Sequence, residues 1–186
     1  FNKSLIDKIN KEVDRISAQK KLIKKNDYSK KLVGQVKQEI LLPKNFIKQF
    51  LAKKISQSIK DYIKSTTGKI PKNVKIKNFW VVSQFSHEYN PVHYHDGHVS
   101  GVGYLKVPNF NINGKELITN GTIDFINGNK MFLNDSIFNH NPKVGDVILF
   151  PNYLMHTAYP FKNNGERRSF SFNAEIDTNI ANVFKK

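Results

Sequence analysis

The spacing of apolar residues changes near residue 73, and this change constrains the fold more than any other feature of the chain. Before that point, apolar side chains recur at three- and four-residue steps, which is typical of amphipathic helices. After it, they alternate with polar residues or form short runs, which is typical of β-strands. The sequence therefore predicts an α+β protein that is mainly β.

We expect residues 1–73 to form a lysine-rich helical segment and residues 74–186 to form a β-rich core. The helices would pack on one face of a sheet, so that both parts belong to one structural domain. A chain of 186 residues is long enough to bury a single core of this kind.

Three helices are predicted in the first part, over about 5–16, 29–41 and 44–65. The polar run Asn26–Ser29 ends the first helix and offers capping residues for the second. Pro43 ends the second helix or begins the third.

The second part contains eight predicted strands, over about 74–77, 79–85, 99–107, 121–126, 130–133, 146–150, 153–159 and 167–176. Turn signals such as Asn113-Gly114 and Asn127-Gly128 separate them. Many short strands with frequent turns favour a β-sandwich or a jelly roll.

The formal net charge is +15, and the excess lies entirely in the first part. Residues 1–77 hold 21 lysines and arginines against 6 acidic residues, whereas residues 78–186 hold 9 of each. Nearly all these cations are lysines, while specific phosphate and base readout favours arginine. We interpret the charge as a solvated helical surface, and a basic nucleic-acid-binding protein stays as a second hypothesis.

The chain has no cysteine, which excludes disulfides, thiolate metal sites and cysteine nucleophiles. This composition fits a reducing, cytoplasmic setting. No apolar run approaches the roughly 20 residues needed to span a membrane, and the first residues lack the hydrophobic region of a signal peptide. We expect a cytoplasmic protein without a membrane partner.

A histidine cluster carries the strongest functional signal. His93, His95, Asp96 and His98 fall within six positions of a chain that has six histidines, and His156 lies downstream between two apolar runs. Histidines at i and i+2 project from the same face of an extended strand. With a distal imidazole they would fill half of an octahedral metal site and leave the other half open, which is typical of mononuclear iron oxygenases.

Five motifs in a fixed order strengthen this interpretation. They are Asn90–His95, Ser100–Leu105, Gly145–Pro151, His156 and Glu166–Asn173. In this order they resemble the iron(II)/2-oxoglutarate-dependent dioxygenases, and more narrowly the 2-oxoglutarate–iron oxygenases of marine bacteriophages and bacteria. The resemblance covers about residues 80–174, and Leu32–Glu39 also resembles the helical segment that precedes the catalytic domain in the phage members.

The resemblance implies a double-stranded β-helix, a cupin-like jelly roll with iron near one mouth of the barrel. It also implies Fe(II) as cofactor, with 2-oxoglutarate and O2 as co-substrates that are converted to succinate and CO2 while an unknown prime substrate is hydroxylated. That substrate could be a protein side chain, a nucleobase or a small metabolite, since fold does not decide among them.

The metal ligands leave three possibilities open. Strand alternation favours His93, His95 and His156, because Asp96 should project to the opposite face. Alternatively, Asp96 supplies a carboxylate through a bend, or His98 takes part through the turn that follows. The family's usual set is His-x-Asp or His-x-Glu with a distal histidine, and this chain departs from it in having His-x-His, as the phage-type members do.

The co-substrate clamp is expected near the end of the chain. Strand alternation puts Arg167, Ser169, Ser171 and Asn173 on one face. It puts Arg168, Phe170 and Phe172 on the other. Arg167 and Ser169 look like the family's Arg-x-Ser clamp for the distal carboxylate of 2-oxoglutarate. The family often has a tyrosine at the position of Gly103, so any co-substrate contact made by that tyrosine would be missing.

A different class of function also fits the pattern. The chain could be a non-catalytic jelly-roll binding module whose histidines are structural. Metal content and succinate formation from 2-oxoglutarate separate this hypothesis from the oxygenase.

Overall fold

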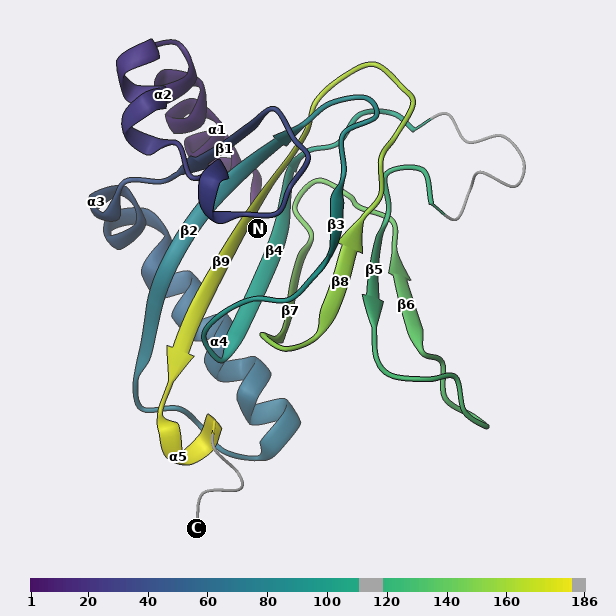
Figure 1. The fold of residues 1–186 in the computed structure, drawn as a ribbon. Coiled ribbons are helices and arrows are strands. Elements are labelled where there is room, and N and C mark those ends of the chain that lie inside the picture. The colour runs from purple at the N-terminus through teal and green to yellow at the C-terminus, as the bar shows by residue number, and fades with distance from the viewer. Residues whose placement is uncertain (111–118, 182–186) are drawn as a thin grey trace.

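Figure 1 shows a computed structural model that describes residues 1–110 and 119–181. The predicted turn at Asn113-Gly114 lies outside the described residues. The protein combines helices with antiparallel strands. The strands form two sheets, and helices pack against the outer face of the larger sheet. Within the described residues, no helix is long and apolar enough to cross a membrane.

Most of the helices belong to the N-terminal part of the chain. They are α1 (Lys3–Ser17), α2 (Lys20–Asn26), the 3-10 turn η1 (Ser29–Lys31), α3 (Lys44–Phe46), the π-helical segment η2 (Ile47–Leu51) and α4 (Ala52–Thr67), with the short α5 (Thr178–Ala181) after the last strand.

The strands form a five-stranded sheet in the order β1-β2-β9-β4-β7 and a four-stranded sheet in the order β3-β8-β5-β6. Their bounds are β1 (Gln38–Leu41), β2 (Val74–Gln84), β3 (Asn90–His93), β4 (Val99–Lys106), β5 (Ile123–Ile126), β6 (Ile137–His140), β7 (Val147–Pro151), β8 (Met155–Ala158) and β9 (Arg167–Ile176).

The first and third predicted helices are confirmed, but the second, over 29–41, is wrong. After the short turn η1, the chain runs as a loop and then as β1, which pairs with β2 and sets Ile40 opposite Val81 in the core. The apolar residues of 32–36 can be read with helical spacing, yet Val33 is 47% exposed. Pairing with a neighbouring strand overrides the local pattern here, and the expected helix at Leu32–Glu39 is wrong for the same reason.

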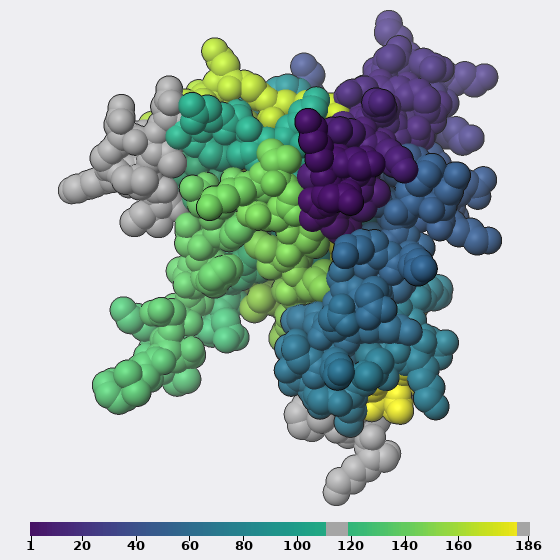
Figure 2. Space-filling view, turned by 180° about the vertical axis from the view of Figure 1, so that it is seen from behind, coloured from purple at the N-terminus to yellow at the C-terminus, as the bar shows by residue number. Residues whose placement is uncertain are grey.

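Most predicted strands are found, with ends that differ by a few residues, but the strand expected over 130–133 is wrong. Met131 and Asn134 close a tight turn in which Leu133 has a positive φ of 61°. Phe132 is 92% exposed at this tip. Figure 2 shows the hairpin between β5 and β6 standing away from the body of the molecule. The short strand β6 was not anticipated, and β3 ends at His93, so His95 lies beyond the extended strand that the histidine spacing predicted.

The core lies between the helices and the larger sheet. Buried apolar residues of α1 and α4 pack in one cluster with Phe79, Phe170 and Phe172. Across the β4–β9 ladder, Gly101 lies opposite Phe172 and Gly103 opposite Phe170. These glycines leave room for the two rings, because a Cβ on either one would collide with the ring opposite.

We expect Gly103→Ala to lower the free energy of unfolding by about 1–3 kcal/mol, the usual cost of overpacking a core. Urea denaturation measures this loss. In a Phe170→Leu background the cost should be smaller, since the shorter side chain leaves room for the methyl group. An equal cost in both backgrounds would contradict the proposed fit of glycine to ring.

Candidate metal and co-substrate site

A cavity of about 320 Å³ lies between the two sheets. Residues of β2, β4 and β9 line one wall, and residues of β3, β5 and β8 line the other. The loop of residues 31–34, which joins η1 to β1, also lines it. Its volume is in the range of small-molecule sites.

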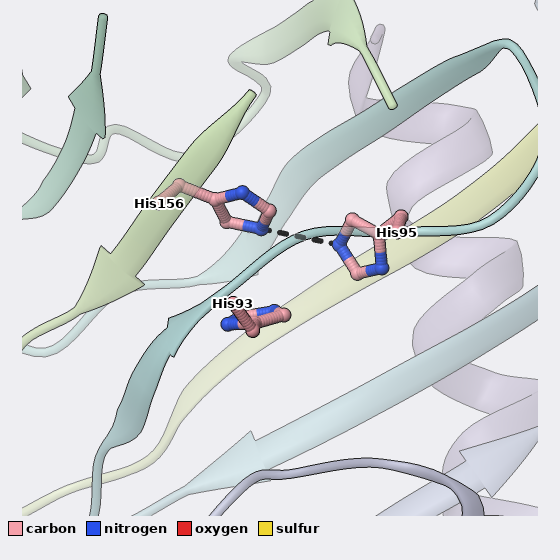
Figure 3. Close-up of side chains that lie close together, drawn as sticks. All are labelled: His93, His95 and His156. Carbon is pink, nitrogen blue, oxygen red and sulfur yellow. Dashed lines mark hydrogen bonds between the residues drawn. The ribbon is translucent and has the colours of Figure 1, made fainter. Parts of the chain in front are cut away.

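Three histidines converge on this cavity. His93 ends β3, His95 lies on the segment that follows, and His156 lies in β8. The antiparallel register sets His93 opposite His156, so both project from the same side of the smaller sheet. Figure 3 shows the three rings turned toward one another, and one nitrogen of each lies within 4.8 Å of the others.

Backbone carbonyls fix the proton on two of these rings. His93 Nδ1 donates to the Pro91 carbonyl oxygen at 2.7 Å, and His156 Nδ1 donates to the Leu154 carbonyl oxygen at 2.9 Å. A carbonyl oxygen only accepts, so each Nε2 keeps its lone pair. His95 Nε2 lies 3.1 Å from His156 Nε2, so these two ring nitrogens point toward the same position. Two lone pairs are thus held ready for a metal by the chain itself.

Burial keeps all three imidazoles neutral. It lowers the pKa of His95 to about 3, with the neighbouring His156 and His93 adding to the effect. Burial likewise lowers the pKa of His156 to about 4 and moves that of His93 in the same direction. Neutral imidazole is the form that binds metal ions.

The other two candidates near the cluster are engaged elsewhere. Lys77 Nζ lies 2.5 Å from the Asp96 carboxylate, whose side chain is 74% exposed, and this hydrogen bond lowers the pKa of Asp96. His98 Nδ1 accepts a hydrogen bond from the Ile176 backbone N–H at 3.0 Å. Asp96 therefore stands at the rim of the cavity, and His98 supports the end of β9.

Arg167 is a buried cation in the wall formed by β9, only 3% exposed. Its Nη atoms donate to the Gly121 carbonyl oxygen and to the Gln84 side-chain oxygen, while Nε has no hydrogen-bond partner. Burial lowers the pKa of this guanidinium. Within the described residues no carboxylate pairs with it, so an anion that entered the cavity would relieve an uncompensated charge.

The predicted phase of β9 is confirmed. The cavity-facing set is Arg167, Ser169, Ser171 and Asn173. Phe170 and Phe172 lie in the core on the other face, and Arg168 there pairs with Glu166 and Asp14.

Two further residues complete this wall, and the sequence pattern gives no specific signal for either of them. Gln84, the last residue of β2, also donates to the carbonyl oxygens of Glu88 and Tyr159, which orients its oxygen toward Arg167. Tyr104 lines the cavity from β4, and burial raises its pKa to about 12. Gly103 faces the core, so a side chain at that position would not reach the cavity.

Glu39 and Asn90 also line the cavity, which the sequence pattern does not indicate. The pattern around Glu39 resembled a helix, whose surface would have carried an ordinary solvated glutamate. The one sequence signal for Glu39 is that acidic residues are rare in this part of the chain, since residues 1–77 contain only 6 of them.

Solved structures with this fold include two prolyl hydroxylases and a protein crystallised with iron. A prolyl-4-hydroxylase of Pseudomonas putida has a TM-score of 0.58 at 15% identity, over 95% of this chain and 87% of that one. HygX of Streptomyces hygroscopicus with iron bound has a TM-score of 0.59 at 12% identity, over 94% and 78%. A collagen prolyl hydroxylase of Paramecium Bursaria Chlorella virus-1, in its 2-oxoglutarate complex, has a TM-score of 0.53 at 16% identity, over 80% and 84%.

A comparison with curated protein sequences finds no match. Residues 78–173, more than half of the chain, match the family model described as "Putative 2OG-Fe(II) oxygenase". This stretch contains the three converging histidines and the buried arginine. The chain therefore belongs to the 2OG-Fe(II) oxygenase family, whose cofactor is Fe(II) and whose co-substrate is 2-oxoglutarate.

Proposed function

We propose that this oxygenase is a hydroxylase in which His93, His95 and His156 hold Fe(II) while Arg167 and Ser169 bind the distal carboxylate of 2-oxoglutarate. The observation that carries the proposal is the convergence of three neutral imidazoles on a cavity whose wall holds an unpaired, buried guanidinium. We also propose that the two sheets form a double-stranded β-helix. The helical segment of residues 1–73 and the core of residues 74–186 would then make one domain, with β1 joining the larger sheet.

The three-imidazole set suits a divalent metal. Imidazole is a ligand for iron, and three ligands from one side leave positions free for a chelating co-substrate and O2. Bound Fe(II) and 2-oxoglutarate would supply the activation of O2. The protein's own contribution is to fix the Nδ1 protons of His93 and His156 on carbonyl oxygens and to keep the rings neutral by burial.

Arg167 suits a carboxylate. Its planar guanidinium offers paired donors, and the unpaired Nε is available for an incoming oxygen. Ser169, two residues along the same face of β9, adds a hydroxyl donor. Gln84 and the Gly121 carbonyl hold the guanidinium in place, so the clamp is preorganised.

Hydroxylation is the reaction we favour because solved structures with this fold include prolyl hydroxylases. The lysine-rich helices α1 and α4 pack on the face of the larger sheet opposite the cavity, so the lysines of these two helices lie away from the site. We therefore favour an oxygenase over the second hypothesis of a basic nucleic-acid-binding protein. The lack of cysteine supports a cytoplasmic setting.

We expect His156→Ala to weaken metal binding by more than about 100-fold, since even groups that merely orient a ligand are worth 10–100-fold. Asp96→Ala should leave metal affinity nearly unchanged, because its carboxylate forms an exposed ion pair with Lys77. Anaerobic Fe(II) titration of both variants measures this. Full loss of iron in Asp96→Ala would refute the three-histidine set.

Arg167→Ala should raise the 2-oxoglutarate concentration needed for half-maximal succinate formation by about 100-fold, the cost of losing charge-assisted hydrogen bonds in a buried site. Arg168→Gln removes the same charge from the opposite face of β9 and serves as the matched control. An unchanged requirement in Arg167→Ala would move the clamp elsewhere.

Metal affinity should vary by less than about threefold between pH 7.5 and pH 6, because the pKa values of His95 and His156 lie well below this range. If the three imidazoles had the ordinary pKa of about 6.5, their protonation would lower the metal affinity roughly 50-fold over the same interval. Mn(II) titration at both pH values measures the change, with Glu39→Gln as a background that removes another titrating group from the cavity. A tenfold loss or more would show that the rings protonate readily.

A further inference from the structure

The cavity holds an acidic group that neither the metal nor the co-substrate assignment uses. Glu39 in β1 is 3% exposed and lines the cavity. The register sets it opposite Val82, which also lines the cavity, whereas Ile40 lies opposite Val81 in the core. Strand alternation therefore directs the Glu39 carboxylate inward.

This carboxylate is not satisfied by the protein. Glu39 Oε2 has no hydrogen-bond partner, and neither has Asn90 Oδ1. Both side chains crowd Gly34: a Cβ built there would lie 2.8 Å from Glu39 Oε1 and closer still to Asn90 Oδ1. Reversing the Asn90 amide would present its NH2 instead, yet Oε2 would stay unpaired. In either orientation of the amide, Glu39 Oε2 is a buried acceptor without a donor among the described residues.

Among the described residues, none of the nearby cations forms an ion pair or hydrogen bond with Glu39, and Arg167 donates to Gly121 and Gln84. Lys77 pairs with Asp96, and Lys31 Nζ lies 5.8 Å over the Tyr28 ring. Within the described residues no ion pair involves Glu39. Burial raises the pKa of Glu39 to about 7, with the nearby Asp27 adding to the effect. A buried acceptor left in this condition costs folding free energy, so its retention in a cavity wall points to a ligand.

The unpaired acceptors lie within reach of the proposed metal centre. Asn90 is opposite Ala158 and His93 is opposite His156 on the same pair of strands. Ala158 and His156 are two residues apart, which along a strand spans roughly 7 Å. A molecule of a few carbon atoms could therefore contact Glu39 at one end and lie beside the metal at the other.

We propose that Glu39 binds a protonated amine of the prime substrate, so that the enzyme oxidises an amine-bearing molecule or side chain. This inference rests on the proposed function of the same site. An ammonium group carries three donors and no acceptor, which matches the unpaired oxygens of Glu39 and Asn90. It also supplies the charge that the buried carboxylate lacks. An anionic group in the same place would meet the Glu39 carboxylate, which forms no ion pair within the described residues and would repel it.

The test uses two probes of the same length, butylammonium and butanol, with the full chain loaded with Mn(II) and 2-oxoglutarate. Broadening of the probe methyl resonance by Mn(II) reports binding near the metal. We expect butylammonium to bind at least about tenfold more tightly than butanol, as for a charge-assisted hydrogen bond. In Glu39→Gln the two probes should bind within about twofold of each other.

Asp61→Asn removes one negative charge from the surface of α4 and should keep the full preference. Glu39→Gln should fold, with a melting temperature no lower than that of the wild type, because it replaces an unpaired buried carboxylate with a neutral group of equal size. The proposal is overturned if butylammonium does not bind, if it binds no more tightly than butanol, or if the preference survives in Glu39→Gln.

Backbone 15N spectra separate this proposal from the proposed function. Butylammonium should shift the amide signals of Gly34 and Gln35, whether or not a metal is present, because Gly34 adjoins both acceptors. Failure of the wild type to bind Mn(II) would refute the metal assignment while these shifts still report the amine. Metal binding without any shift at Gly34 would refute the amine site alone.

Discussion

The antiparallel pairing of β9 with β2 and β4 is the constraint on which both the core and the cavity depend. Because β9 lies between these strands in the sheet, its side chains point either toward the core or toward the cavity. Phe170 and Phe172 fill the core on one side, helped by the glycines of β4. Arg167 and Ser169 face the cavity on the other. A shift of one residue in this register would exchange the two sets and destroy both.

Several buried polar atoms of the cavity have no hydrogen-bond partner among the described residues: Glu39 Oε2, Asn90 Oδ1 and Arg167 Nε. Neutral imidazoles offer lone pairs, Arg167 offers a buried positive charge, and Glu39 offers a buried acceptor. The unpaired atoms depart from the rule that buried polar groups are paired. In the function and the substrate class proposed above, the groups of the cavity would meet a metal cation, a carboxylate and an amine.

Part of this site could be predicted because strand alternation is a local property. The spacing of His93 and His95, and the phase of Arg167 and Ser169, follow from side chains that project alternately from an extended chain. The helix expected over 29–41 failed because its apolar residues fit helical spacing as well as they fit a loop and a strand. Only pairing with β2 decides between them, and each residue of β1 pairs with one at least 39 positions further along the chain.

The sequence by itself determined the class of the fold, the family, the histidine cluster and the face of β9 that carries the arginine. Only the tertiary structure decided which groups meet. It set His156 opposite His93, engaged Asp96 with Lys77, and brought Glu39 from an N-terminal strand into the same cavity. The physical reason is that alternation and periodicity are written in neighbouring residues, whereas register between distant strands depends on the packing of the whole core.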